Sequence, residues 1–550
     1  MKTNGRLSLF ARCCNRHRIL LLLACITILS VYNLSSFFFI TQPKPLSKYP
    51  YHSTHPPNIR ADLNIDSGVL GAYVQERFYD FLNESTYDVP LHSSLLEWND
   101  TVDYYPETLM ETNWSHELHL KESIFFVNLQ HRCLIDRGVL IRSVSRSQIE
   151  MGSTVSDAMI FRNDSRLVSI LKECPAIDVY VPESLRGDGY CEDGLAYLRG
   201  LNTRLMPRWV FEDSFYDPAV GKIITYFEMC PSTAVVFLNH YWDGFNKLPT
   251  WPKEKPIYLM FNAEMYEITP EHLWLSDVVL TKSLDAYRRT TKWFQQNGNP
   301  KGTVVFYTRH TTTDVTTLAA QASKIIEKDF NEVRIRHAPG GSHQKNTPAI
   351  AKCWMEDPSM PLLEIFVPPE MMRWREFARS PWNLLNHSNY KVYPTRLSAK
   401  DFGDVLTHST FFLCPSAMEG YGHYINQARA AGGVVLTTNA PPMNELVTSS
   451  SGFLVSIERR KSDPKQLLGG AYEAPDGLKN SPGIGALVKW ENICEAVSRL
   501  ISDTTPKERE MMSLKVKRQY AFDTNFFLYK MRVLEAFAWD KLAKKLSKES

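Results

Sequence analysis

The sequence predicts an α/β protein in which two Rossmann-like domains, each built on a parallel sheet, face a cleft. Three observations support this prediction. Short apolar runs alternate with helical stretches through residues 121–320, a second alternation fills residues 321–515, and residues 411–447 have the pattern strand, glycine loop, helix, strand. Such alternation is typical of parallel sheets, because each parallel pair needs a crossover connection. A chain of 550 residues has room for about two to four domains.

The N-terminal segment predicts a membrane anchor. Residues 19–40, ILLLLACITILSVYNLSSFFFI, are mostly apolar and uncharged, and they are long enough to span a bilayer as one helix. Basic residues precede them and no acidic residue occurs before Asp62, so the positive-inside rule places residues 1–18 in the cytosol and the rest in a lumen. A cleaved signal peptide is the alternative, since polar residues interrupt the apolar run and signal peptides also begin with basic residues.

Residues 41–120 predict a luminal stem, because five prolines between Pro43 and Pro57 prevent helix formation and favour an extended chain. Asn-x-Ser/Thr tripeptides follow the anchor and are used as N-glycosylation sites only in a secretory compartment. These tripeptides begin at Asn83, Asn99, Asn113, Asn163 and Asn386.

Cysteine usage fits a lumen. Seven cysteines lie beyond the anchor, an odd number, so at least one stays unpaired or pairs between chains. We expect one bridge within the first domain, drawn from Cys174, Cys191 and Cys230. Cys414 ends an apolar run and is expected as a buried thiol.

The strands of the first domain, residues 121–320, are predicted from apolar runs with helical stretches such as CEDGLAYLRGL between them. The runs are SIFFVNL, AIDVYVP, TAVVFLNHY, KPIYLMF, SDVVLTK and GTVVFYT. The second domain, residues 321–515, continues the pattern, and residues 516–550 have helical spacing and charge. Its runs are VRIRHAPGG, PLLEIFVPP, YKVYP, TFFLCPS, GGVVLTT and GFLVSI.

Composition and missing motifs exclude several function classes. There are 62 basic and 60 acidic residues and no basic run interleaved with aromatics, so no nucleic-acid partner is expected. No two aspartates are separated by a single residue, so no divalent metal site of the Asp-x-Asp type is predicted and we expect no cofactor. Hydrolase elbows, zinc spacings and Walker loops are also absent from the sequence.

The glycine loop predicts a nucleotide-sugar site. Gly420 and Gly422 let the backbone approach a ligand, and the helix that starts near Tyr424 directs unpaired amides and a positive dipole end at an anion such as a diphosphate. Glu419 and Gln427 place two polar side chains beside it, which suits sugar hydroxyls. An ordinary strand–turn–helix unit without a ligand is the alternative.

This segment, FFLCPSAMEGYGHYINQARAAGG, resembles the C-terminal-domain motif of retaining glycosyltransferases with the GT-B fold (glycosyl transferases group 1, family 4-like). The family pattern is Glu, seven residues, Glu. The resemblance implies that Glu419 contacts the donor sugar and Gln427 the ribose, and that the C-terminal helix crosses back to the first domain. Gln427 departs from the pattern because an amide lacks the charge of a carboxylate. A glycan- or nucleotide-sugar-binding pseudoenzyme of the same fold is therefore the alternative function.

Two basic residues are candidates for the donor diphosphate. Lys345 lies in HAPGGSHQKNTPAIAKCW, a glycine loop after a predicted strand, and its ammonium would stabilise the leaving diphosphate, as a lysine in this loop does in the family. A solvated loop lysine is the alternative. Arg309, at the close of the first domain, is a weaker candidate, for which an interdomain salt bridge is an equal alternative.

The first domain offers candidates near the acceptor. Asp188 lies in the loop LRGDGYCEDG and would orient an acceptor hydroxyl, because the corresponding loop lies near the acceptor in GT-B enzymes. A helix-capping or first-turn role explains the neighbouring acids Glu192 and Asp193 equally well. His240 ends a predicted strand, and the carboxyl ends of strands line the ligand crevice in open α/β sheets. A hydrogen-bonded structural role for His240 is the alternative. Asn262 and Glu264 follow another strand and are expected to fix the cleft wall.

Together these patterns predict a single-pass type II membrane glycosyltransferase of the Golgi or endoplasmic reticulum with a luminal catalytic part. It would move a sugar, hexosyltransferase-like, from a nucleotide-diphosphate donor to a hydroxyl of a glycoprotein, glycolipid or secondary metabolite. Retention of configuration is implied by the resemblance alone.

Overall fold

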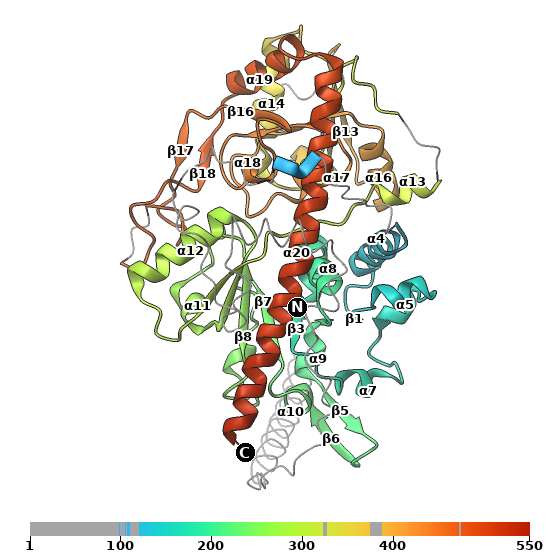
Figure 1. Ribbon diagram of the computed structural model, residues 1–550, viewed down its shortest axis with the longest axis vertical. Helices are drawn as coiled ribbons and strands as arrows, with labels where there is room; N and C mark the ends of the chain where they lie inside the picture. Colours follow the sequence, from blue (N-terminus) through green and yellow to red (C-terminus); the bar gives the residue numbers. More distant parts are fainter. Residues whose placement is uncertain are drawn as a thin grey trace, which may run out of the picture. The chain divides into compact units, whose positions relative to one another are not determined.

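A computed structural model describes most of the chain beyond the predicted stem (Figure 1). The described residues are Trp98, Tyr105, 107–110, 120–322, 327–373, 388–471 and 475–549. The predicted anchor at residues 19–40, the cytosolic tail, nearly all of the stem and the sequons at Asn83, Asn99, Asn113 and Asn386 lie outside them. In the part of the chain that is described, no helix has the length and apolarity needed to cross a membrane.

The first lobe is built on an eight-stranded sheet. Its strands, in pairing order, are β10 (Val304–Tyr307), β9 (Val278–Thr281), β8 (Ile257–Phe261), β7 (Ala234–Leu238), β3 (Ile177–Tyr180), β4 (Arg204–Met206), β1 (Leu140–Arg142) and β2 (Met159–Ile160). All pairs from β10 to β4 are parallel, whereas β1 runs antiparallel to both of its neighbours. The predicted parallel sheet is confirmed, with an antiparallel edge added.

Helices cover both faces of this sheet. On β7, Val236 and Leu238 share a core with α4, α8 and α20, while Val235 and Phe237 share one with α9, α10 and α12. Side chains alternate across a strand, so both faces are buried and the strand is apolar throughout. The first-lobe elements outside the sheet are α4 (Leu120–Ile135), α5 (Arg146–Glu150), α6 (Val155–Ala158), α7 (Leu167–Leu171), the turns η5 (Glu183–Leu185), η6 (Arg186–Tyr190) and η7 (Phe245–Lys247), α8 (Cys191–Gly200), α9 (Arg208–Glu212), the hairpin β5 (Ser214–Asp217) and β6 (Lys222–Thr225), α10 (Tyr226–Met229), α11 (Pro270–Leu275) and α12 (Leu284–Asn297).

One predicted strand is wrong. The run SIFFVNL lies inside α4, whose buried residues include Phe125, Phe126, Leu129 and Cys133. These positions follow the helical spacing of three and four residues, and four consecutive apolar residues hid that period. Short apolar runs fit a buried strand and a buried helix equally well, and here the sixteen-residue length decides for the helix.

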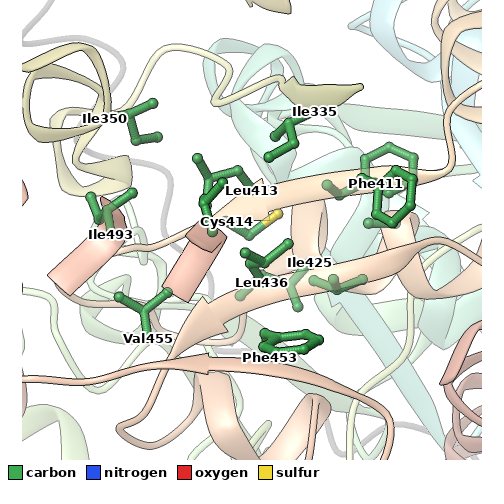
Figure 2. Packing of buried hydrophobic residues seen from close by; sticks show 14 of the residues in the cluster. Ile335, Ile350, Phe411, Leu413, Cys414, Ile425, Leu436, Phe453, Val455 and Ile493 are labelled. Atoms are coloured by element: carbon green, nitrogen blue, oxygen red, sulfur yellow. The ribbon is translucent and has the colours of Figure 1, made fainter. Parts of the chain in front are cut away.

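The second lobe contains a six-stranded, fully parallel sheet. Its strands in pairing order are β13 (Tyr390–Pro394), β12 (Leu363–Val367), β11 (Ile335–His337), β14 (Phe411–Cys414), β15 (Val434–Thr438) and β16 (Gly452–Val455), and each matches a predicted run. Figure 2 shows side chains of β11, β14, β15 and β16 packed with Ile350, Ile425 and Ile493 of the covering helices. The remaining elements are α13 (Thr317–Ala322), η8 (His343–Lys345), α14 (Thr347–Glu356), η9 (Pro369–Arg373), α16 (Ala399–Thr407), α17 (His423–Ala430), α18 (Met443–Leu446), the hairpin β17 (Arg459–Lys461) and β18 (Gly485–Leu487), and α19 (Trp490–Ser502).

A long C-terminal helix, α20 (Pro506–Glu549), contacts both lobes (Figure 1). It packs on α17, β15 and β16 of the second lobe and on α8 of the first. Met531 lies so close to Gly200 that a Cβ there would be 2.5 Å from its side chain. The helix begins at Pro506, ahead of the predicted segment 516–550, and it crosses back to the first lobe as the resemblance implied.

Within the described ranges three disulfides form, between Cys133 and Cys191, Cys174 and Cys230, and Cys353 and Cys494. The expected bridge among Cys174, Cys191 and Cys230 is confirmed as the Cys174–Cys230 pair. Cys414 is a buried free thiol, as predicted, and burial raises its pKa, so it stays protonated and unreactive.

Candidate active site

A cleft of about 670 Å³ lies between the two lobes, where the carboxyl ends of both parallel sheets meet. From the first lobe it is lined by Asn262 and Glu264, which follow β8, and by Lys282, which follows β9. From the second lobe it is lined by residues 338–342 after β11 and by residues 419–422 after β14. Open α/β sheets bind ligands at this edge, so the cleft is the candidate active site.

All but one of the residues predicted to bind the donor line this cleft, and the exception is Arg309. The residues that line it are Glu419, Gly420, Gly422, Gln427 and Lys345. They come from two loops separated by more than seventy residues, and each loop follows a parallel strand into a helix. The structure therefore brings the predicted sugar, ribose and diphosphate groups together, while their roles stay predictions.

The glycine turn is shaped by two local requirements. Gly422 has a φ of 106° and precedes α17, a backbone conformation that side chains rarely adopt. Gly420 lies against the first lobe, where a Cβ would be 2.5 Å from Oε2 of Glu264 and 2.6 Å from Cβ of Asn262. Gly422 and His423, at the start of α17, therefore line the cleft, while Gly420 touches the opposite wall.

Lys345 and Glu419 form an ion pair at the centre of the cleft. The Lys345 ammonium contacts Oε1 of Glu419, to which the Ser416 hydroxyl also donates. The lysine lies over the Tyr424 ring, 4.2 Å from its centroid. Both charged side chains are largely buried, 13% and 8% exposed. The group predicted for the diphosphate and the group predicted for the sugar are therefore adjacent, as the two parts of one donor require.

A second helix start completes the donor side. The loop after β11 leads through η8 to Asn346, which has a φ of 58° and precedes α14. His337, at the end of β11, holds this helix: its Nδ1 lies 2.7 Å from the Leu413 carbonyl and its Nε2 lies 2.9 Å from the Thr347 hydroxyl. Burial lowers the pKa of His337 to about 4, so the ring is neutral and can donate to one partner and accept from the other.

The floor of the cleft contains an ionic cluster that the sequence did not indicate. Both carboxylate oxygens of Asp193 lie 2.8 Å from the Lys282 ammonium, and Oδ1 also lies 3.0 Å from Nε2 of His310 and 2.9 Å from Nε2 of His423. Burial alone would raise the pKa of Asp193, but the Lys282 ammonium and the two imidazoles hold it well below its usual range. Because α8 carries Asp193 and α17 carries His423, the cluster joins the lobes.

Asp193, His310 and His423 could also hold a metal ion, since their ligand atoms lie within 4.8 Å of one another. Lys282 already contacts both oxygens of Asp193. A divalent ion bound to Asp193 would have to displace the Lys282 ammonium or deprotonate it, because two neighbouring positive charges repel strongly in a buried site of low dielectric constant. The donor set therefore fits an ion pair better than a metal centre.

The other predicted site residues lie elsewhere. The Arg309 guanidinium pairs with Asp523 on α20, is buried under Tyr105, and does not line the cleft, so the structure shows the interlobe ion pair instead of a phosphate ligand. The His240 ring lies against the Tyr241 ring, with centroids 4.0 Å apart and the planes tilted by 37°, and His240 does not line the cleft either. Oδ1 of the preceding residue, Asn239, accepts a hydrogen bond from the backbone amide of Asn262 at 2.7 Å, which fixes this wall of the cleft.

The acceptor-side loop is placed as expected. Residues 186–190 form the π-helical turn η6 between β3 and α8, and Gly187 and Gly189 line the cleft. Asp188 lies in this turn, and its proposed role stays a prediction. Asn163, the one sequon within the described ranges, is exposed after β2, where a glycan would not disturb the core.

A second cavity of about 480 Å³ lies at the opposite end of the first sheet, where residues 202–204 lead into β4. It is rich in arginine, but the guanidiniums already face carboxylates. Arg142 lies 3.8 Å from Glu173, Arg199 lies 3.4 Å from Glu122, and Arg204 pairs with Asp178 at 2.7 Å. This balance of charge makes the cleft the better candidate for an anionic substrate.

Comparison with known proteins finds only distant structural similarity. No family model and no curated protein matches the sequence. Similar solved structures include an α,α-trehalose 6-phosphate synthase from Burkholderia multivorans, with 11% identity over 68% of this chain and 98% of that chain and a TM-score of 0.42. Anabaena HepE in complex with UDP and glucose has 13% identity over 57% and 78%, with a TM-score of 0.36. A complex of S. aureus MnaA with UDP has 14% identity over 53% and 73%, with a TM-score of 0.33. Similarities this low carry no argument, so the function has to be inferred from the cleft itself.

Proposed function

We propose that this protein is a glycosyltransferase that moves a sugar from a nucleotide-diphosphate donor to an acceptor hydroxyl in the cleft between its lobes. The observation that carries the proposal is the convergence of Lys345, Glu419, Gln427 and the glycine turn on one cleft at two helix starts. A cation and helix N-termini suit a diphosphate, and a carboxylate and an amide suit sugar hydroxyls. This combination matches the two chemical halves of a nucleotide sugar.

The chemistry would depend mainly on the leaving group. As the bond between sugar and phosphate breaks, negative charge develops on the diphosphate, and Lys345 with the amides of α17 would stabilise it. Glu419 is next to Lys345 and would accept from sugar hydroxyls, which fixes the reacting carbon relative to the acceptor. Gln427, one turn into α17, would accept from a ribose hydroxyl through its amide oxygen.

The acceptor would enter past the first-lobe turn η6, close to Asp188. A glycoprotein, glycolipid or secondary metabolite remains part of the proposal, as does retention of configuration, which rests on the motif resemblance. Membrane anchoring through residues 19–40 and a Golgi or endoplasmic reticulum location are proposed as well. Three disulfides within the described ranges support an oxidising compartment, because disulfides are rare in the cytosol of most cells.

The proposal is tested with purified full-length protein and a panel of UDP- and GDP-sugars. We expect at least one to raise the melting temperature, since a ligand at a hundred times its Kd stabilises the folded state by about 2.7 kcal/mol. The same sugar should release nucleotide with turnover, and Glu419→Ala should abolish release while the unliganded protein still melts cooperatively. Unchanged turnover in Glu419→Ala would remove this residue from the site.

A pseudoenzyme that binds a nucleotide sugar without transfer is the second candidate, and Gln427 in place of a glutamate favours it. Such a protein would be stabilised by the panel but would release no nucleotide, with or without added acceptors. In that case Gln427→Glu should tighten nucleotide-sugar binding, because a carboxylate makes stronger, charge-assisted hydrogen bonds to ribose hydroxyls. Measured nucleotide release above the rate of uncatalysed hydrolysis decides between the two candidates.

A further inference from the structure

Two oxygens of the first-lobe wall have no hydrogen-bond donor among the described residues. They are Oδ1 of Asn262 and Oε2 of Glu264, both buried and both on side chains that line the cleft. Glu264 is only 9% exposed. Leaving a buried polar atom without a hydrogen-bond partner costs about 1–3 kcal/mol of folding free energy, so such atoms need an explanation. A ligand in the cleft would supply the missing partner.

The surroundings of Glu264 place its carboxyl group at the predicted donor. Oε2 lies against the glycine turn, 2.5 Å from where a Cβ of Gly420 would be. The charged groups that face it are Glu419 and Lys345 from the second lobe and Lys282 from the end of β9. The backbone carbonyl of Glu264 is fixed independently, since it accepts from Nε2 of Gln466 at 2.6 Å. The carboxyl group also accepts from the backbone amide of Glu264 itself, so it is held in place while Oε2 stays without a donor among the described residues.

The electrostatic surroundings of Glu264 favour the protonated form of its carboxyl group. Burial raises the pKa of Glu264 and Glu419 adds to the rise, while the hydrogen bond from its own backbone amide and the ammonium groups of Lys282 and Lys345 oppose it, and the resulting pKa is about 7. A bound diphosphate would bring negative charge close to the carboxyl group and would draw on the positive charge of Lys345. Both changes disfavour ionisation of Glu264, so donor binding should be accompanied by proton uptake.

We propose that Glu264 is a positioning residue for the nucleotide sugar. Its carboxyl group is protonated when the nucleotide sugar is bound, and it donates a hydrogen bond to an oxygen of that ligand. The inference rests on the proposed function. The proton comes from solvent, binds a carboxylate oxygen when the donor enters, and returns to solvent when the donor leaves. No bond of the donor forms or breaks in this step.

Isothermal titration calorimetry of the full-length protein tests the proposal, with UDP- and GDP-sugars in buffers of different ionisation enthalpy. Intact nucleotide sugars are used because the terminal phosphate of a free nucleoside diphosphate itself titrates near pH 6. We expect uptake of about half a proton at pH 7, close to one at pH 8 and close to none at pH 6. The affinity should fall by up to about tenfold for each pH unit above 8.

Variants separate Glu264 from other titrating groups. Glu264→Gln keeps a donor hydrogen and should bind the nucleotide sugar with no proton uptake and with an affinity independent of pH. Glu264→Asp should retain uptake with weaker binding, and it covers the case in which the amide disturbs the wall. Glu267→Gln, an exposed residue of the same loop, is the matched control and should behave as wild type.

The outcomes are distinct. Binding without proton uptake in the wild type, or uptake that persists in Glu264→Gln, overturns this inference and leaves the proposed function intact. If no sugar of the panel binds or turns over, the proposed function fails and this inference fails with it.

Discussion

Replacement of Lys345 by methionine separates the stability of the cleft from its chemistry. In the described structure the Lys345 ammonium neutralises Glu419, and both side chains are largely buried, at 13% and 8% exposed. Methionine keeps the length and apolar stem of lysine but removes the charge. The variant therefore leaves the Glu419 carboxylate in the cleft without its cation, and the Ser416 hydroxyl still donates to it.

The expected loss of stability follows from this geometry. Removing one partner of a buried ion pair typically costs about 3–5 kcal/mol, because the remaining charge is uncompensated. The lower end, about 3 kcal/mol, applies here, since the pair is partly exposed and Ser416 still donates. The loss in transfer is separate: without a cation for the leaving diphosphate, kcat should fall by about 10²–10³-fold.

A double variant distinguishes the two losses. Lys345→Met with Glu419→Gln removes both charges, so urea unfolding should show most of the stability restored, whereas nucleotide release should stay at background. Lys352→Met, an exposed lysine on α14, is the matched control and should leave both measurements near wild type. Wild-type transfer in Lys345→Met, or equal stability of the single and double variants, would refute the reasoning.

Three further predictions follow from single features of the structure. Gly420→Ala should weaken nucleotide-sugar binding at least tenfold, because its Cβ would be 2.5 Å from Glu264, while Gly138→Ala, which does not line the cleft and whose Cβ would make only an ordinary contact at 3.8 Å, should bind normally in the same calorimetric assay. The pKa of His337 is about 4 in the folded state, below its unfolded value near 6.5. The free energy of unfolding should therefore fall by about 3 kcal/mol as the pH decreases from 6.5 to 4, because the unfolded state binds the proton first. His337→Gln should flatten the urea-unfolding free energy over that range, and exposed His408→Gln should not. Dialysis against EDTA should leave nucleotide release unchanged, since Lys282 already neutralises the carboxylate that a metal would need; a stoichiometric loss restored by added metal would contradict this.

The sequence was most informative where structure depends on local order. All six strands of the parallel sheet of the second lobe were predicted, because such strands form short, mainly apolar runs bounded by turn residues, whereas the hairpin of β17 and β18 was not predicted. The glycine turn was equally visible, since a close backbone approach and a positive φ at Gly422 require small residues at fixed spacing. Prediction failed at the edge of the first sheet, where β1 and β4 are only three residues long and carry arginine, and at α4, whose apolar run concealed its helical period.

The first-lobe half of the site could not be predicted because its residues have no sequence spacing relative to the donor motif. Asp193 meets His423 across 230 residues, and no sequence spacing relates the two. His240 is a candidate because it ends a predicted strand, and Arg309 because it is a basic residue at the close of the first domain. The loop conformations after those strands turn Asn239 toward the cleft wall and Arg309 toward Asp523. Strand ends define an edge of the sheet, and only tertiary contacts decide which side chains enter the cleft.

Those contacts show that the donor motif is shared between the lobes. Within four residues of the second lobe, Gly420 lies against Glu264, the Tyr421 hydroxyl donates to the His310 carbonyl, and His423 contacts Asp193. The three partners belong to different elements of the first lobe, namely the loop after β8, the loop after β10 and helix α8, so any movement between the lobes changes the shape of the glycine turn. Substitutions in the first lobe, far from the glycine motif in sequence, should therefore alter donor affinity as strongly as substitutions within the motif, because both change the same surface.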